Sequence, residues 1–200
     1  MSQRLKIALV LSSTREGRLN DQVARLVRNQ IGQEHDVDIL DPKCLETTDT
    51  QQSVNFLYNP GAVPQNIVDY NEKLKTFDAF LFVCAEYNFS IPPGLTNMFD
   101  NFPPPTFMWK PCAMVNYSIN PLGGSRSAIQ LLTYTHGLGM MPVPKQVAIP
   151  KAHEVVDKDG NTMDENLVEE IQLLLQHLYW AANALKRHKA VVPGPHWAPS

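Results

Sequence analysis

The stretch over residues 78–84 narrows the possible folds of this chain more than any other. Its sequence, DAFLFVC, is an almost unbroken apolar run, which is typical of a strand buried on both faces of a parallel sheet. The composition changes at Ala85 to polar and turn-forming residues, and Pro93 and Gly94 mark a position where a helix can begin. A buried strand, a polar loop and a helix in this order predict an α/β fold, whose ligands bind at the carboxyl ends of the strands.

The same pattern recurs along the chain. Four further apolar runs predict strands at residues 5–11, 37–40, 111–117 and 146–149. Apolar residues at helical spacing predict helices near residues 23–31, 67–74, 95–102 and 129–138, and a long closing helix that ends at residue 186. Thr162 and Glu165 have the spacing of a capping box at the start of that helix. We therefore predict one α/β domain over residues 1–189 and a flexible tail, residues 190–200, that contains Trp197.

Charge and cysteine content exclude several classes of protein. The net charge is −3 with 18% charged residues, so the chain lacks the basic stripe of a nucleic-acid-binding protein. Cys44, Cys84 and Cys112 are odd in number and far apart, which favours reduced, buried thiols over a disulfide framework. The six histidines lack ligand spacing, and no apolar segment is long enough to cross a bilayer. We expect a cytoplasmic protein with no bound metal and no membrane or nucleic-acid partner.

The loop after the first predicted strand has the composition of an anion site. Ser12, Ser13 and Thr14 supply hydroxyl groups, and Arg15 and Arg18 supply positive charge just before a helix. Unpaired N–H groups and the positive end of a helix dipole bind phosphate groups at such positions. The alternative is that the hydroxyls only cap the helix and the arginines are solvated. The loop matches neither the GxxxxGK[ST] pattern of a P-loop nor the GxGxxG pattern of a dinucleotide-binding fold.

A third polar loop follows the strand predicted at residues 111–117. It contains the pair Gly123 and Gly124, which lets a backbone approach a flat ligand, although a simple tight turn is the commoner reason for such a pair. Right-handed crossovers place the loops after the first, third and fourth strands at the same edge of the sheet. We therefore expect these three loops to form one ligand site.

In this combination the three loops resemble those of the NADPH-dependent FMN reductase family, which includes azoreductases and quinone reductases with a flavodoxin-like fold. The resemblance covers residues 6–159. It rests on three groups of residues in chain order: Ser13-Thr14-Arg15 with Gly17-Arg18, then Glu86-Tyr87-Asn88 with Pro93-Gly94-Leu95 and Asn97, then Gly123-Gly124 with Arg126. The chain departs from the family pattern at Ser12, where the family usually has Gly, and at Ala85, where it usually has Pro.

The resemblance implies a flavodoxin-like three-layer sandwich around a five-stranded parallel sheet of order 2-1-3-4-5. It implies FMN as cofactor, NADPH or NADH as hydride donor, and an oxidoreductase that passes a hydride through the flavin N5 to a quinone, an azo compound or a similar small acceptor in a ping-pong cycle. Family members are usually homodimers with the site near the interface. We predict that residues 102–109 contact the second subunit or the substrate.

The resemblance also implies roles for individual residues. The FMN phosphate would be held by Ser13, Thr14, Arg15, Arg18 and Asn20. The isoalloxazine edge would be lined by Glu86, Tyr87 and Asn88, largely through backbone groups, and the pyrimidine end by Ser118, Gly123 and Gly124. Tyr87 would pack on the ring or shape the acceptor pocket. No side chain is expected to act as a catalytic acid or base, because the flavin supplies the chemistry.

Two other functions stay open at this point. One is a flavodoxin-like electron carrier that a partner protein reduces, and the other is a flavin-based redox sensor or interaction protein. The near-neutral charge and the missing T-x-T-G-x-T loop count against the carrier. Rapid multiple turnover with NADPH and a quinone would distinguish the enzyme from both.

Overall fold

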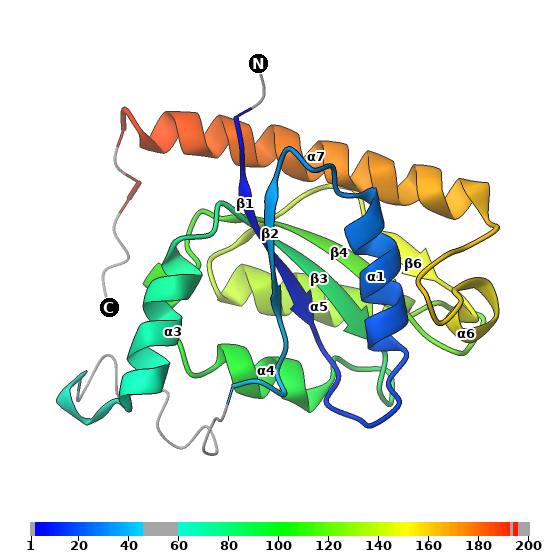
Figure 1. Cartoon of the computed structure of the whole chain (residues 1–200). Helices are drawn as coiled ribbons and strands as arrows, with labels where there is room; N and C mark the ends of the chain where they lie inside the picture. Colours follow the sequence, from blue (N-terminus) through cyan, green and yellow to red (C-terminus); the bar gives the residue numbers. More distant parts are fainter. Residues whose placement is uncertain (1–2, 46–59, 193, 196–200) are drawn as a thin grey trace.

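The computed structural model describes residues 3–45, 60–192 and 194–195 of the chain. A parallel β-sheet lies at the centre of the molecule. Its strands are β1 (Lys6–Leu11), β2 (Asp36–Leu40), β3 (Ala79–Ala85), β4 (Pro111–Tyr117), β5 (Met141–Pro142) and β6 (Val147–Ile149). They lie in the order β2-β1-β3-β4-β5, and β6 also pairs with β4. The predicted order 2-1-3-4-5 is therefore confirmed. Figure 1 shows β1, β2, β3 and β4 at the centre of the molecule.

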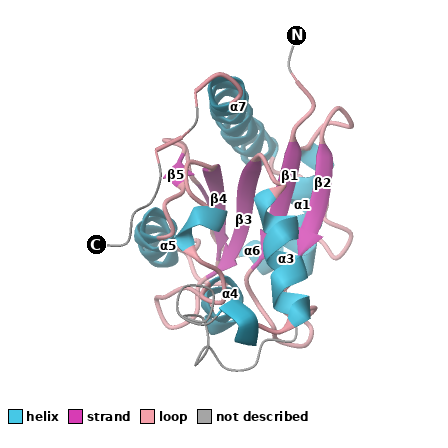
Figure 2. Ribbon diagram, turned by 90° about the vertical axis from the view of Figure 1, so that its left-hand side faces the viewer, coloured by secondary structure: helices cyan, strands magenta, loops and turns pink. Residues whose placement is uncertain are grey.

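Helices cover both faces of the sheet (Figure 2). One face packs on α1 (Asn20–Gln30) and α7 (Glu165–Lys189), and the other packs on α3 (Gln65–Lys75), α4 (Pro93–Phe99) and α5 (Ser125–Gly137). Successive side chains of β3 alternate between the two cores, with Leu81 and Val83 on the first side and Phe80 and Phe82 on the second. Because β3 is buried on both faces, its sequence is apolar throughout. A short α6 (Ala152–Val155) follows β6, and 3₁₀ turns lie at Pro60–Ala62 and Pro104–Thr106.

The last strand differs from its prediction. One strand was expected at residues 146–149, but the edge next to β4 consists of two short strands. The first, β5, pairs with Pro111 and Cys112, and the second, β6, pairs with residues 115–117. Pro142 and Pro144 have no N–H to donate, and proline is tolerated at a sheet edge where it interrupts the strand. The edge is therefore split.

The start of α7 also corrects a prediction. The capping box between Thr162 and Glu165 does not form. Asp164 is the N-cap, and its side chain accepts a 3.0 Å hydrogen bond from the Leu167 N–H. The Thr162 hydroxyl instead accepts a 3.1 Å bond from the Asp164 N–H. Asp caps helices as well as Thr does, and here it lies directly before the first helical residue.

The proline-rich segment at residues 102–109 packs mainly on the rest of the chain. Thr106 and Phe107 are fully buried, and the Phe107 ring lies 5.1 Å from that of Phe99. Trp109 is more exposed, and its indole N–H donates a 3.3 Å hydrogen bond to the Pro195 carbonyl. A contact of this segment with a second subunit or a substrate stays a prediction, as does the single domain over residues 1–189. Trp197 lies outside the described residues.

All three cysteines are free. Cys84 and Cys112 are buried in β3 and β4, and burial raises the pKa of each thiol to about 12. Cys44 is exposed, so the prediction that it is buried was wrong. In the described ranges, no group of three or more His, Cys, Asp or Glu side chains is placed to hold a metal ion. No helix in these ranges has the length and apolar character needed to cross a membrane.

His35 makes stability depend on pH. It is buried, it accepts a 3.4 Å hydrogen bond from the Leu5 N–H through Nδ1, and its ring lies 4.3 Å from that of Tyr179. Burial lowers the pKa of His35 from 6.5. Above pH 6.5 the imidazole is neutral in both the folded and the unfolded state. Below pH 6.5 the unfolded state takes up a proton first, so the free energy of unfolding falls as the pH drops from 6.5 through the folded-state pKa. We expect urea midpoints to fall over this window in the parent protein and to change less in His35→Gln. An equal fall in both proteins would contradict this role.

Candidate functional site

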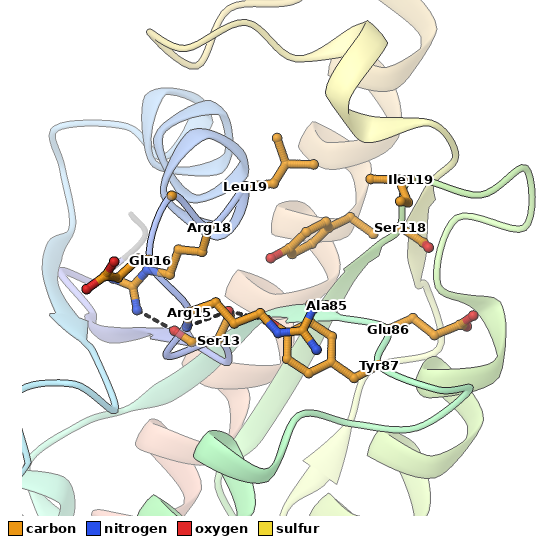
Figure 3. Close-up of a pocket in the computed structure, with 12 residues that line it drawn as sticks. Ser13, Arg15, Glu16, Arg18, Leu19, Ala85, Glu86, Tyr87, Ser118 and Ile119 are labelled. Atoms are coloured by element: carbon orange, nitrogen blue, oxygen red, sulfur yellow. Dashed lines mark hydrogen bonds between the residues drawn. The ribbon is translucent and has the colours of Figure 1, made fainter.

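The loops that follow β1, β3 and β4 meet around one cavity at the carboxyl edge of the sheet (Figure 3). Its volume is about 260 Å³. It is lined by Ser13, Arg15, Glu16, Gly17, Arg18, Leu19, Ala85, Glu86, Tyr87, Tyr117, Ser118 and Ile119. Six of the eleven predicted site residues are in this set, and the other five, Thr14, Asn20, Asn88, Gly123 and Gly124, are not.

Asn20, the first residue of α1, holds the first loop against the sheet. It is fully buried. Its Oδ1 accepts hydrogen bonds from the N–H groups of Ser12 and Ser13, both at 2.8 Å, and its Nδ2 donates to the Val83 carbonyl at 3.0 Å. The side chain thus fixes the course of the loop that leads into the cavity. A contact between Asn20 and a phosphate stays a prediction.

Arg18 has protein partners on every side. It forms a bidentate pair with Asp41, which follows β2, an ion pair of 2.8 Å with Asp21, and a hydrogen bond to the Ser13 carbonyl. Its side chain is only 6% exposed. Hydrogen bonding to Asp41 raises the pKa of Arg18 above its usual value. Two carboxylates therefore balance this guanidinium, which makes it a brace between the first loop and β2.

Arg15 is the exposed cation of the first loop. Its guanidinium lies over the Tyr87 ring, 3.6 Å from the centroid, and the Tyr87 hydroxyl hydrogen-bonds the Ser13 hydroxyl. Within the described part of the chain, Arg15 forms no ion pair, and the N–H groups of Thr14, Glu16 and Gly17 find no hydrogen-bond partner. A cation beside unpaired backbone donors just before a helix is a donor set that suits a phosphate. These residues fit the phosphate end of FMN.

Glu86 joins the second loop to the third. Its side chain is 2% exposed and accepts hydrogen bonds from the Arg126 guanidinium at 2.6 Å, the N–H groups of Arg126 and Ser127 at the start of α5, and the Asn120 amide. Burial opposes its ionisation, but the bonds from Arg126 and Asn120 outweigh burial and lower the pKa of Glu86. The carboxylate points away from the cavity (Figure 3). Any contribution of Glu86 to ligand binding would therefore come from its backbone.

Ser12 and Ala85, the two positions where the sequence departs from the pattern it resembles, are in contact. The Ala85 N–H donates a 2.9 Å hydrogen bond to the Ser12 hydroxyl, and both residues are buried. A proline at position 85 would have no N–H, so it would need no acceptor there. The Ser12 hydroxyl satisfies the donor that alanine introduces. The sequence shows both residues but not their contact.

This contact predicts an energetic coupling. Ser12→Ala should lower the free energy of unfolding by about 1–2 kcal/mol, because the buried Ala85 N–H loses its acceptor. Adding Ala85→Pro should recover most of that loss, because proline has no N–H and the unpaired donor at position 85 is removed. Urea unfolding of the parent, both single variants and the double variant measures the coupling. Strictly additive losses would show that the two positions are independent.

The paired glycines pack the third loop closely on the sheet. Gly123 and Gly124 have positive φ values of 62° and 84°. A Cβ at Gly123 would lie 2.7 Å from the Pro150 nitrogen, and one at Gly124 would lie 2.8 Å from the Tyr117 nitrogen. Larger residues would push this loop off β4 and β6. Contact of either glycine with a flavin stays a prediction.

Tyr117 is the main cavity residue that the sequence analysis did not name. It is the last residue of β4 and is buried, and burial raises its pKa. Its position was available as a signal, because the final residue of a buried strand faces the ligand edge of an α/β sheet. Asp41 was also missed, although an acidic residue directly after the second predicted strand is visible in the sequence.

Comparison with known proteins gives consistent matches. The chain matches the family model described as NADPH-dependent FMN reductase over residues 5–154. It is 25% identical to a quinone reductase of Escherichia coli K12 over 180 residues, which cover 86% of this chain and 92% of that protein. It is 31% identical to an NAD(P)H-dependent FMN reductase of Pseudomonas aeruginosa over 119 residues, which cover 58% of this chain and 64% of that protein.

A solved structure shares the fold. FerB, a flavoenzyme NAD(P)H:(acceptor) oxidoreductase from Paracoccus denitrificans, superposes with a TM-score of 0.71 at 18% identity. The match covers 92% of this chain and 98% of FerB. At this identity the likeness concerns the fold.

Proposed function

The chain belongs to the NADPH-dependent FMN reductase family, and on this premise we propose that it passes a hydride from NAD(P)H through FMN to a quinone or a similar small acceptor. Family membership makes it an NAD(P)H-dependent flavin oxidoreductase that uses FMN. The ping-pong cycle and the class of acceptor are part of the proposal. The observation that supports it best is the set of unpaired donors of the first loop beside Arg15, at a cavity lined by the second and third loops.

The proposal gives each loop a task. The N–H groups of Thr14, Glu16 and Gly17 and the Arg15 guanidinium bind the phosphate, while Asn20 and Arg18 keep this loop in shape. The second and third loops hold the isoalloxazine against the backbone at Glu86 and Tyr87. FMN held there would supply the redox chemistry that carries the two electrons of one hydride from NAD(P)H to the acceptor, which would take up protons from solvent. Small-molecule sites usually span about 300–1,000 Å³. The cavity here is about 260 Å³, so part of the flavin would lie outside it.

Steady-state kinetics test this function. NADPH and a quinone are varied together with the FMN-loaded protein. A ping-pong enzyme gives parallel lines in a double-reciprocal plot and many turnovers per flavin. Intersecting lines would contradict the ping-pong cycle. Reduction only by a partner reductase would support a carrier, and a single turnover with a redox-dependent change in binding would support a sensor.

A homodimer is part of the proposal, and α5 offers an apolar surface for it. Ile129 and Leu132 are 68% and 40% exposed, and residues three positions apart lie on the same side of a helix. Because α5 begins at the third loop, a partner on this face would lie close to the cavity. We expect Ile129→Lys to shift the protein to a monomer in sedimentation velocity, whereas Glu169→Lys on α7 should leave the mass unchanged. A monomeric parent would overturn the dimer.

We also propose a cytoplasmic location for the protein. Its three free thiols support this, because reduced cysteines are the usual state in that compartment. Fractionation of cells that express the full chain tests the location.

A further inference from the structure

Tyr117 carries a phenol hydroxyl that has no partner in the described part of the chain. The residue ends β4 and lines the cavity together with the loops after β1 and β3. It is only 4% exposed, and its ring packs in the core on the side of α1 and α7. The ring is therefore held in place, while its hydroxyl forms no hydrogen bond with any residue that the structure describes.

A second tyrosine shows that the Tyr117 hydroxyl is open to the cavity. The Tyr179 hydroxyl on α7 also lacks a partner among the described residues, and it is buried away from solvent. The Tyr117 hydroxyl is not enclosed in this way. Because the rest of the residue is buried and the residue lines the cavity, the accessible hydroxyl faces the cavity. It is a donor that a bound ligand can use.

Core packing does not explain the hydroxyl. Phenylalanine would fill the same place, and a hydroxyl that is partly removed from water costs free energy unless it is hydrogen-bonded. Burial raises the pKa of Tyr117, so the hydroxyl keeps its proton at neutral pH and acts as a donor. The residues that carry the family resemblance do not include position 117. The hydroxyl is thus a feature of this chain that calls for a ligand.

The surroundings of Tyr117 indicate which part of FMN the hydroxyl meets. Leu19 of the first loop and Tyr87 of the second loop pack against the same core cluster as Tyr117. Besides burial, Tyr87 and Arg18 also act on the pKa of Tyr117. Tyr117 therefore lies between the loop proposed to bind the phosphate and the loop proposed to line the ring. The ribityl chain joins these two parts of FMN, and its hydroxyls accept hydrogen bonds.

We propose that the Tyr117 hydroxyl donates a hydrogen bond to the ribityl chain of FMN. This inference rests on the proposed function, because it takes the cavity as the flavin site. A hydrogen bond between neutral groups makes binding about 3–10-fold tighter. Tyr117 would then be a cofactor-binding residue that fixes the flavin between its phosphate and its ring, and it would take no part in the hydride transfer.

Tyr117→Phe tests the contact, because it removes the hydroxyl and keeps the ring. Three flavins locate the contact: FMN, riboflavin, which lacks the phosphate, and lumiflavin, which has neither the phosphate nor the ribityl chain. In fluorescence titrations of the flavin-free protein, the variant should lose about 3–10-fold in affinity for FMN and for riboflavin. Its affinity for lumiflavin should stay the same. The urea midpoint of the flavin-free variant should not fall, because the hydroxyl has no protein partner to lose.

Tyr179→Phe is the matched control. It also removes a phenol hydroxyl that lacks a partner among the described residues, but Tyr179 does not line the cavity. The control should keep the affinity of the parent for all three flavins. Its urea midpoint should rise, because an unpaired buried hydroxyl is removed. Only the cavity hydroxyl is thus expected to change flavin binding.

The possible outcomes distinguish this inference from the proposed function. Unchanged affinity for FMN in Tyr117→Phe would overturn the contact. A loss for FMN alone would place the hydroxyl at the phosphate, and an equal loss for lumiflavin would place it at the ring, so either result would overturn the ribityl contact. A parent protein that binds FMN but does not pass electrons from NADPH to a quinone would overturn the proposed function and leave the contact standing. A parent that binds none of the three flavins would overturn both.

Discussion

Asn20→Ala is expected to lower the free energy of unfolding by about 3 kcal/mol and to abolish retention of FMN. The substitution leaves the Ser12 and Ser13 N–H groups and the Val83 carbonyl without their partner. Each unsatisfied buried group costs about 1–3 kcal/mol, and partial access to water reduces the sum. The first loop would also lose the anchor that directs its donors toward the cavity.

Urea unfolding and the ratio of bound flavin to protein after gel filtration measure the two effects. Asn29→Ala is the matched control, because Asn29 is an exposed residue of the same helix. It should change the free energy of unfolding by less than about 0.5 kcal/mol, as is usual for surface positions. An Asn20→Ala variant that is as stable as this control and still yellow would contradict the anchoring role.

Arg15→Ala is expected to weaken FMN binding by about tenfold or more. Arg15 is the exposed cation of the first loop, and a hydrogen bond to a charged group contributes about 1.5–3 kcal/mol. Stability should change little, because the side chain is exposed. The expected result is therefore a loss of affinity in a folded protein.

Fluorescence titration of FMN into the flavin-free protein gives the affinity. Lys43→Ala removes one positive charge from the exposed loop after β2 and controls for a general change in electrostatic attraction. An equal loss in both variants would show that only net charge matters. No loss in Arg15→Ala would exclude a contact between this residue and the phosphate.

The sequence was sufficient to predict the strand order of the sheet and three loops that line one cavity. Apolar runs such as residues 79–85 are buried on both faces, so the strand and the loop after it could be recognised without any distant contact. Crossover handedness then places the three loops at one edge. The apolar pattern did not predict the last strand correctly. It indicates one strand, but the prolines at 142 and 144 divide this edge into the two short strands β5 and β6.

The partners within the site could not be predicted, because they come from residues far apart in the chain. The sequence predicts that Arg18 contacts the phosphate, and this stays a prediction; what the sequence could not show is that the Arg18 guanidinium donates hydrogen bonds to Asp41, 23 positions away. Glu86 was predicted to line the flavin edge through its backbone, and this stays a prediction; what the sequence could not show is that its carboxylate caps α5, 40 positions away. Each ionic residue takes its role from the charge that the fold brings beside it. Composition indicated the three loops that line the cavity. Only the tertiary structure shows that Arg18 pairs with Asp41, whereas Arg15 lies exposed over the Tyr87 ring.

The central claim is that the first loop binds the phosphate of FMN. The most direct test compares the affinities of the parent protein for FMN and for riboflavin, which lacks the phosphate. Three or four charge-assisted hydrogen bonds at about 1.5–3 kcal/mol each predict FMN binding at least about 100-fold tighter than riboflavin binding. Arg15→Ala should narrow this ratio and leave the affinity for riboflavin unchanged. Equal affinities of the parent for the two flavins would contradict a phosphate site in the first loop.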